Sequence, residues 1–500
     1  MALAYVLSPL LIVAAGALLL MLVEAFAKRP AGAQHHQETK GLALGTTMVF
    51  AAGFAFSLGA WLNGVDNVPG VEALAPWLVV DRFTLFFDGL FCLGGALAAL
   101  LAGGYLPEHG LERGEFYSLL LFATLGAMMV AGAGDVLVVF LGLETMSIGA
   151  YALTAFRRTS PRSAEGGLKY FLLGSFAAAL LLYGFALLYG ATGHTDLVGI
   201  GEAVKKGDRA PMLVIALVLV LVGLVFKVSA VPFHMWAPDA YEGAPTPATT
   251  YMAAVVKCGA FAMLLRVLLT CFGDKGSMSW SAGWPPVLAM IAVLTMTVAN
   301  LIAGQQESVK RMLAYSSVAH AGYLLVGVVA TMHSMSQGTS AVLFYLLTYT
   351  VSTAGAFGSL ILCGRRGAEA VTYEDLAGIG RRHPAAALAF SLFLVSLAGI
   401  PPTAGFFGKW FVFRAAIDSG FYLLTVIAFL NSVIGAYYYL RVLVFMYMRE
   451  PAAGAPIATP MRSGYVAAAL VLSAILVLVL GIIPSQSLDM AVKAASIFGG

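Results

Sequence analysis

Four ionisable residues lie inside long apolar stretches of this 500-residue chain. They are Glu144, Lys227, Lys257 and Lys409. A charged side chain in such surroundings is costly, so it is expected only where it has a function or a partner. Lysines and a carboxylate in apolar surroundings are suited to proton transfer, which makes these four residues the candidate site.

A buried lysine can carry protons, because loss of hydration lowers its pKa toward the range in which it both accepts and releases. A nearby carboxylate raises that pKa again. A change in the position or charge of Glu144 would therefore switch a neighbouring lysine between holding and releasing a proton. The alternative for each residue is a static buried ion pair, or a side chain that reaches water at a helix end.

Two histidines could connect these sites. His234 and His320 both fall at apparent membrane depth, and a histidine titrates near neutral pH, so each is a possible proton relay. A hydrogen-bonded structural histidine is an equally good interpretation of either one. For Asp239 and Glu242, which follow His234 in a loop, we expect a loop-fixing role.

The elements that must position these residues are membrane helices. The sequence is 60% hydrophobic and 11% charged, which excludes a soluble domain of this length. Continuous apolar stretches recur along the chain, and each is long enough for a helix across the bilayer rather than for a barrel strand. The first, 4–26, has neither a basic start nor a cleavage site, so we expect a retained helix. The predicted fold class is an all-α polytopic membrane protein.

Other classes of site are not indicated. The net charge is +3, and the basic residues are scattered, so nucleic acid is not an expected partner. The 4 cysteines stand singly, which gives no disulfide or metal pattern. No dinucleotide, phosphate-loop, haem or iron–sulfur motif is present. We therefore expect no metal and no redox cofactor in this chain.

The apolar pattern predicts about 14 spans. Their expected ranges are 4–26, 41–62, 83–104, 116–130, 134–156, 168–190, 211–234, 245–271, 284–304, 308–330, 340–364, 386–416, 421–448 and 463–483. Loops after odd-numbered spans hold roughly 15 Lys and Arg residues, against roughly 6 in the other loops and the C-terminal tail. Lys28, Arg29, Lys310, Arg365 and Arg366 are among the larger group. Because basic loops stay in the cytoplasm, both termini are expected outside.

Prolines interrupt two of these spans. Pro232 falls in the seventh, with Pro238, Pro245 and Pro247 after it, and the adjacent Pro401 and Pro402 fall in the twelfth. Proline removes a helix hydrogen bond and clashes with the preceding turn, so both helices should break. Irregular backbone at membrane depth is tolerated where it is buried in protein or lines a wet cavity, which makes both breaks candidate ion paths. A kink that only helps packing is the alternative.

The two breaks are five spans apart, which suggests a five-helix unit that occurs twice. An odd number of helices would invert the second copy in the membrane, as in many transporters. The predicted organisation is 1–115 for three N-terminal helices, 116–271 for the first repeat, 284–448 for the inverted second repeat and 449–500 for a C-terminal helix.

Several motifs resemble the antiporter-like membrane subunits of respiratory complex I, the proton-pumping NADH:quinone oxidoreductase. They are FLGLETMSIGAYAL around Glu144, PFHMWAPDAYEGAPTPATT after Lys227, ESVKRMLAYSSVAHAGYLL from Glu307 and LAGIPPTAGFFGKW ending after Lys409. The likeness covers most of 83–448. A lysine at Lys409, where the M-type subunits have glutamate, makes the sequence similar to the bacterial N-type group.

The resemblance implies a fold of about 14 helices, inverted five-helix repeats, and broken helices 7 and 12 in a bacterial plasma (inner) membrane. It implies that Glu144 and Lys227 interact, that Lys257 is the central proton carrier and that Lys409 is the exit-side carrier. It also implies that NADH, FMN, iron–sulfur clusters and quinone bind to partner subunits. The expected partners are neighbouring antiporter-like and small membrane subunits, together with membrane lipids.

Two other functions remain open at this point. An Mrp-type cation/proton antiporter subunit would have the same fold but would be driven by ion gradients, and Lys409 favours the N-type group over it. A scaffold would use the buried charges only to fix helix packing.

Overall fold

The computed structural model of the protein describes residues 2–26, 38–64, 74–206, 211–364, 369, 371–451 and 460–499. Its helices are, in chain order, α1 (Ala2–Val6), α2 (Ser8–Phe26), α3 (Glu38–Asn63), α4 (Arg82–Glu108), α5 (Glu115–Ala131), α6 (Val136–Thr154), α7 (Pro161–Thr192), α8 (Leu197–Lys206), α9 (Pro211–Lys227), α10 (Trp236–Gly243), α11 (Thr246–Tyr251), α12 (Lys257–Cys271), α13 (Pro285–Gln305), α14 (Val309–Ala330), α15 (Met335–Leu362), α16 (Ile379–Arg382), α17 (Pro384–Ala398), α18 (Ala404–Asp418), α19 (Tyr422–Met448), α20 (Gly464–Ile482) and α21 (Ser485–Ala495). The described part of the chain has no β-strand, only isolated bridges between loops. The all-α prediction is confirmed.

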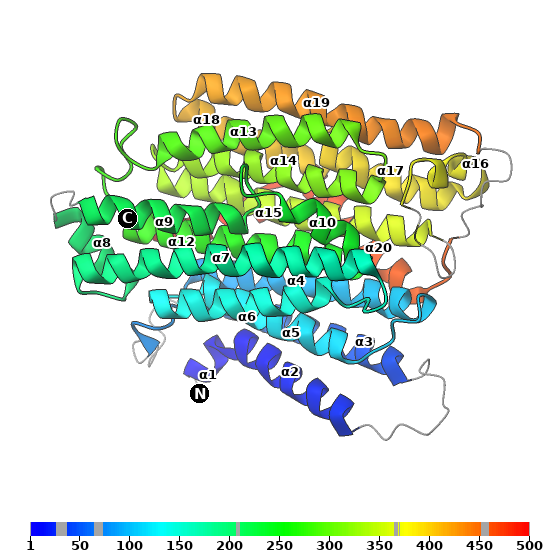
Figure 1. Cartoon of the computed structure of the whole chain (residues 1–500), viewed down its shortest axis with the longest axis horizontal. Coiled ribbons are helices and arrows are strands. Elements are labelled where there is room, and N and C mark those ends of the chain that lie inside the picture. Colours follow the sequence, from blue (N-terminus) through cyan, green and yellow to red (C-terminus); the bar gives the residue numbers. More distant parts are fainter. Residues whose placement is uncertain are drawn as a thin grey trace.

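Figure 1 shows the long helices side by side, with α2 and α3 at one edge of the molecule and α13 and α19 at the other. Several of them begin at a polar residue that caps the first turn. Asp81 accepts a hydrogen bond from the backbone N–H of Thr84, and Asp135 accepts one from Leu137. A cap of this kind satisfies a backbone donor that has no partner inside the helix. The caps therefore fix where these apolar helices start.

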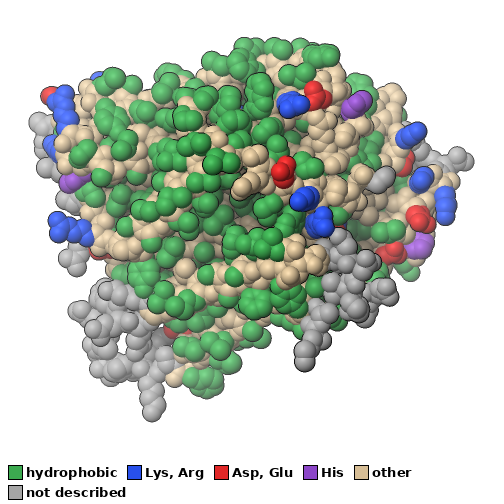
Figure 2. Space-filling model, turned by 180° about the vertical axis from the view of Figure 1, so that it is seen from behind, with side chains coloured by type: hydrophobic (Ala, Val, Ile, Leu, Met, Phe, Trp, Pro, Cys, Tyr) green, Lys and Arg blue, Asp and Glu red, His purple; other side chains and the backbone are tan. Residues whose placement is uncertain are grey.

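Eleven helices in the described residues are long and apolar enough to cross a membrane. Helices α5, α9 and α17 are shorter, at 17, 17 and 15 residues. Figure 2 shows a face covered mainly by hydrophobic side chains, with most charged side chains toward its two ends. This distribution suits a multi-pass membrane protein. The count of about 14 spans stays a prediction.

The centre of the molecule consists of helices that are no more apolar than most of those at its surface. The segment Thr246–Cys271 is entirely buried over its most apolar window, and the corresponding windows of α14 and α15 are 94% buried. By contrast, the α19 window is 39% buried, although its mean hydropathy is higher than that of either α14 or α15. Burial among other helices, rather than apolarity, thus distinguishes the central helices.

Both predicted helix breaks are confirmed. Helix α9 ends at Lys227, and α10 begins only at Trp236. Helix α17 ends at Ala398, and α18 begins at Ala404. In each break a residue with positive φ is followed three residues later by a proline: Ser229 (φ 64) precedes Pro232, and Gly399 (φ 84) precedes Pro402.

The orientation prediction depends partly on residues without a described position. Lys28, Arg29, Arg209, Arg365 and Arg366 lie outside the described residues. Lys310, which was counted with the loops, is buried at the first turn of α14.

Candidate functional site

The first break places Lys227 in the interior. Lys227 is the last residue of α9 and is 4% exposed. Its Nζ donates a hydrogen bond of 2.6 Å to Ser147 Oγ on α6. The same ammonium lies 5.5 Å from the ring centroid of Tyr151 and 5.3 Å from that of Tyr170. The aromatic faces and one hydroxyl therefore take the place of water around this charge.

Glu144 lies one turn before Ser147 on α6 and lines the same small cavity as Lys227. Its Oε1 has no hydrogen-bond partner among the described residues. The volume within this cavity that the centre of a water molecule can occupy is about 10 Å³. This is close to the minimum needed to hold one water molecule. The structure thus brings Glu144 and Lys227 together, although the direct partner of Lys227 is Ser147.

Lys257 follows a π-helical turn, Met252–Val256, at the start of α12. A π-turn inserts one residue, which rotates the following side chains by about 100° compared with a continuous α-helix. Lys257 Nζ donates to both Ser317 O and Ser317 Oγ on α14. It also lies 5.4 Å from the ring centroid of Tyr349 on α15. Three of the most buried segments therefore meet at Lys257.

His320 joins this centre to α19. It lies one turn beyond Ser317 on α14, and Nδ1 is 2.7 Å from Tyr345 Oη. Its Nε2 is 3.1 Å from Tyr439 Oη, and the Tyr439 hydroxyl also bonds to Ser316 Oγ. Both ring nitrogens therefore have hydroxyl partners, which suits a relay between two directions.

Lys409 lies on α18, and its side chain reaches back to the second break. Its Nζ donates to Ala398 O and to Ser432 Oγ, both at 2.8 Å, and lies 5.2 Å from the Tyr323 ring centroid. A Cβ at Gly399 would lie 2.9 Å from Lys409 Cδ. Gly399 is therefore required both by its positive φ and by the path of the lysine side chain.

A row of polar side chains connects His320 with Lys409. The hydroxyl of Tyr438, next to Tyr439 on α19, donates to Asn300 Oδ1 at 2.9 Å. Asn300 Nδ2 donates to Tyr323 Oη at 2.9 Å, and Lys409 lies over that tyrosine ring. The sequence analysis missed these hydroxyls and amides, together with Ser317 and Tyr349. The polar residues that interrupt the apolar segments around His320 and Tyr439 are the sequence feature that could have indicated some of them.

The remaining predicted residues lie elsewhere. The His234 ring is 6.4 Å from that of Tyr315, and its Nδ1 has no partner among the described residues. Asp239 forms ion pairs with Lys169 and Arg311, both at 2.8 Å, and Glu242 pairs with Arg311 at 2.9 Å. Asp239 and Glu242 lie on helix α10 and not in a loop as expected, and their ion pairs join α10 to α7 and α14 beside the first break.

Comparison with known proteins decides the family. Residues 133–435 match the family described as NADH:quinone oxidoreductase/Mrp antiporter, TM. The NADH-quinone oxidoreductase subunit N 1 of Sorangium cellulosum is 67% identical over 496 residues, which cover 97% of each chain. The chain belongs to this family and to its subunit N group. Glu144, Lys227, Lys257 and Lys409 all lie inside the matched range.

Other relatives of the subunit N group agree with this assignment. Subunit N of Trichlorobacter lovleyi is 44% identical over 473 residues, covering 91% of this chain and 94% of that protein. A chain of respiratory complex I from Thermus thermophilus with bound aureothin is 35% identical with a TM-score of 0.77, covering 96% of this chain and 98% of that one. A chain of the Mrp complex from Dietzia sp. has a TM-score of 0.86 at 23% identity, covering 100% and 98% of the two chains. The last comparison shows a shared fold.

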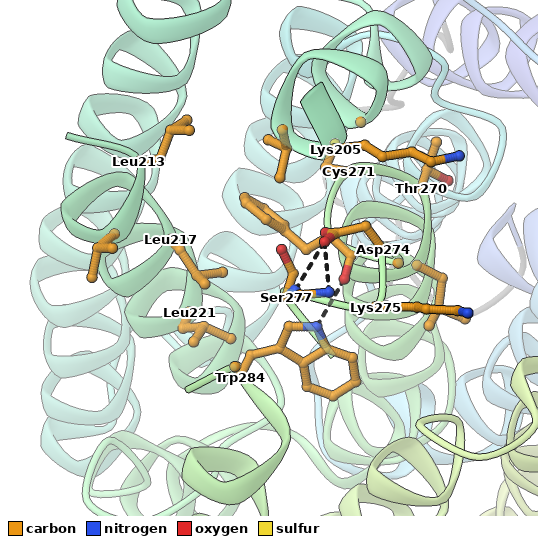
Figure 3. A pocket seen from close by; sticks show the side chains of 18 of the residues that line it. Lys205, Leu213, Leu217, Leu221, Thr270, Cys271, Asp274, Lys275, Ser277 and Trp284 are labelled. Atoms are coloured by element: carbon orange, nitrogen blue, oxygen red, sulfur yellow. Dashed lines mark hydrogen bonds between the residues drawn. The ribbon is translucent and has the colours of Figure 1, made fainter. Parts of the chain in front are cut away.

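This protein also has a large cleft, which is lined by none of the predicted site residues. It has a volume of about 1120 Å³ and lies between α8, α9 and the connection from α12 to α13. In Figure 3, Leu213, Leu217 and Leu221 form one side, and Asp274 accepts a backbone hydrogen bond from Ser277 near Trp284. The described residues contain no group of three His, Cys, Asp or Glu side chains that could hold a metal ion.

Proposed function

We propose that this chain is the proton-translocating membrane subunit N of an NADH:quinone oxidoreductase, respiratory complex I. The observation that carries the proposal is the row of buried polar side chains between Lys257 and Lys409, in which hydrogen bonds alternate with ring contacts. Hydroxyl and imidazole groups can accept one proton and release another, and a lysine does so by alternating between its neutral amine and its ammonium form. An apolar scaffold would have no use for such a row, since each buried polar group costs free energy.

In the proposed cycle, electron transfer in partner subunits perturbs the pair Glu144 and Lys227. When Glu144 is charged, Lys227 holds its proton more tightly, and when Glu144 moves or is neutralised, Lys227 releases it. The proton then passes to Lys257. From there Ser317, His320 and the tyrosines of α15 and α19 relay it to Lys409. His234 has no partner in this row and is left as a possible side relay.

The finer features of the fold belong to the same proposal. We infer about 14 spans, with α5, α9 joined to α10, and α17 joined to α18 added to the longer helices. Matching loop contacts support an inverted repeat. The N–H of Val136 at the start of α6 donates to Thr195 O after α7, and the N–H of Val309 at the start of α14 donates to Val371 O after α15. The proposed units remain 1–115, 116–271, 284–448 and 449–500.

Location and partners follow from the family. We infer a bacterial plasma membrane with both termini on the outer side, because loops at the Lys310 end of the bundle carry most of the basic residues. NADH, FMN, iron–sulfur clusters and quinone would bind to other subunits. This chain would contact neighbouring antiporter-like and small membrane subunits as well as lipid.

The test begins with purification of the tagged chain from its native membranes in mild detergent. We expect flavin and iron–sulfur subunits to accompany it, together with NADH:quinone reductase activity. Recovery of the chain with only small membrane proteins and without that activity would favour the Mrp-type antiporter instead.

The second step is proton pumping by Lys257→Ala in the assembled complex. Pumping and turnover should both fall at least about tenfold, because the central carrier is lost. Lys275→Ala, in the loop after α12, is the control and should behave as the wild type. Normal pumping by a correctly assembled Lys257→Ala complex would refute the role of Lys257.

A further inference from the structure

A buried ion cluster lies at one end of the bundle and is not used by the proposed row. Lys310 Nζ, 1% exposed at the start of α14, donates to Ala244 O at 2.7 Å and to Glu369 Oε2 at 3.0 Å. The Tyr105 hydroxyl of α4 donates to Glu369, and Arg157, after α6, lies 3.6 Å from it. Glu369 therefore contacts two helices, α4 and α14, and the loop after α6.

The exposure of this cluster decreases inward. The side chain of Arg157 is 32% exposed, that of Glu369 is 15% exposed and that of Lys310 is 1% exposed. A cluster that only tied loops together would not need to carry an ammonium group into the interior, where desolvation is costly. The arrangement instead places titratable groups in order from the surface toward the core.

The cluster points along α14 to the centre of the candidate site. Lys310 and Ser317 are seven residues apart, which places them on the same face of the helix about 10 Å apart along its axis. Ser317 is the partner of Lys257. A proton that travels from the surface to Lys257 through this cluster would therefore still have to cross the distance between Lys310 and Ser317.

Two buried hydroxyl groups of α15 lie between the level of the cluster and the level of Lys257. Thr353 and Ser359 are 3% and 0% exposed. Neither hydroxyl has a hydrogen-bond partner of good geometry among the described residues, although that of Thr353 interacts with the Tyr349 hydroxyl. Thr353 lies one turn from Tyr349, whose hydroxyl donates to Ser317 Oγ at 2.8 Å. A Cβ on Gly358, beside Ser359, would lie 2.9 Å from Leu101, one turn before Tyr105 on α4. Ser359 is therefore near the level of the cluster, and Thr353 is near the level of Lys257.

Buried hydroxyl groups almost always bond to protein or to ordered water. We propose that Lys310, Glu369, Ser359 and Thr353 form a hydrated entrance through which protons reach Lys257 from the Lys310 end of the bundle. This inference rests on the proposed function. Glu369 accepts a proton from surface water, and Lys310 and water molecules held by Ser359 and Thr353 each accept one proton and release one. Tyr349 and Ser317 complete the route to Lys257.

The charges around Glu369 are compatible with this role. Lys310 faces it from α14, Arg157 from the loop after α6 and Tyr105 from α4. His109, at the end of α4, and Glu242 on α10 also act on this cluster. Burial raises the pKa of Glu369 to about 8, so this carboxyl group can exchange protons near neutral pH.

The test uses Thr353→Val and Ser359→Ala in the full complex, assayed for quinone reduction and proton pumping in inverted membrane vesicles. Thr353→Val keeps the shape of the side chain and removes the hydroxyl. We expect about a three- to tenfold loss of coupled turnover for the double variant at pH 8, relieved at pH 6, because the cytoplasmic face is outside and a higher proton concentration compensates for a slow entrance.

The matched control is Thr339→Val. Thr339 is on the same helix, is 0% exposed and also has no partner for its hydroxyl among the described residues, but it lies near the opposite end of α15. It should keep wild-type turnover at both pH values. A loss of the same size at all pH values, or an equal loss in Thr339→Val, would show a packing defect and overturn the proposal.

Glu369→Gln provides a second variant outside the membrane-spanning helices and should show the same relief at low pH. Assembly is checked by the amount of complex and by NADH oxidation with an artificial acceptor. If all three variants pump normally while Lys257→Ala does not, the entrance is refuted and the proposed function stands. If Lys257→Ala also pumps normally, the proposed function itself fails.

Discussion

Lys227 donates its short hydrogen bond to Ser147 and not to Glu144, although Glu144 is only one helical turn away on the same helix. The carboxylate and the ammonium group line the same small cavity, but the hydrogen bond of the ammonium group goes to Ser147. Ser147 therefore holds the lysine apart from the carboxylate. Such an arrangement leaves the pair able to approach or separate, which a closed ion pair would resist.

We predict that Ser147→Ala shifts Lys227 toward Glu144 and lowers proton pumping. Loss of the hydroxyl leaves a buried ammonium without its partner, at a cost of about 1 to 3 kcal/mol, so pairing with the carboxylate becomes favourable. Quinone reduction and proton pumping in vesicles should fall about five- to tenfold. Thr145→Val, on the same helix and with its hydroxyl bonded to Leu141 O, is the control. Unchanged pumping in Ser147→Ala would show that Ser147 does not hold the pair apart.

We predict that Tyr439→Phe interrupts the row between Lys257 and Lys409. The substitution removes the hydroxyl that contacts both His320 and Ser316 but keeps the ring. Pumping should fall about three- to tenfold while the amount of assembled complex stays the same, because the two lost hydrogen bonds together contribute only about 1 to 3 kcal/mol to stability. Tyr437, two residues before Tyr439, is exposed on α19, so Tyr437→Phe should have no effect. Equal activities in the two variants would exclude Tyr439 from the route.

The helix breaks could be predicted from the sequence because proline acts locally. Pro232 and Pro402 end the hydrogen-bonded helix wherever the rest of the chain lies. The charged residues were equally visible, because a lysine such as Lys257 stands out in an apolar segment. Prolines and charged residues are easy to recognise within apolar helices, so both the breaks and the candidate lysines could be predicted from the sequence.

The partners of those residues could not be predicted, because they depend on how helices pack. Nothing in the sequence Met252–Val256 indicates a π-turn, yet that turn sets the direction of Lys257. Ser317 is an ordinary helix residue until α12 lies against it. Lys310 resembled a loop residue because it follows a polar segment, and only the position of Glu369 makes it part of a buried cluster.

We predict that Arg266→Met destabilises the protein without a specific effect on pumping. Arg266, buried on α12, forms two hydrogen bonds to the carboxylate of Asp81, at 2.6 and 3.0 Å. Removing one partner of a buried ion pair costs about 3 to 5 kcal/mol, because the other charge is left unpaired. The solubilised complex should therefore unfold at a lower temperature.

The control for this pair is Arg381→Met, which removes an exposed ion pair with Glu450. Exposed pairs contribute about 0 to 1 kcal/mol, so the unfolding temperature should change little. An Arg266→Met complex as heat-resistant as the wild type would show that the buried pair is not structural.

We predict that His109 makes the protein less stable as the pH falls from about 6.5 to about 4. Burial, together with Arg157 and Lys310, lowers the pKa of His109 to about 4. The unfolded chain binds a proton at the ordinary histidine pKa, so in this range it holds more protons than the folded chain, and stability falls with decreasing pH. His109→Asn removes this titration, and its unfolding temperature should depend less steeply on pH than that of the wild type. His333→Asn, at an exposed position, is the control for the substitution itself. The same slope in His109→Asn and the wild type would mean that His109 is protonated in the folded protein.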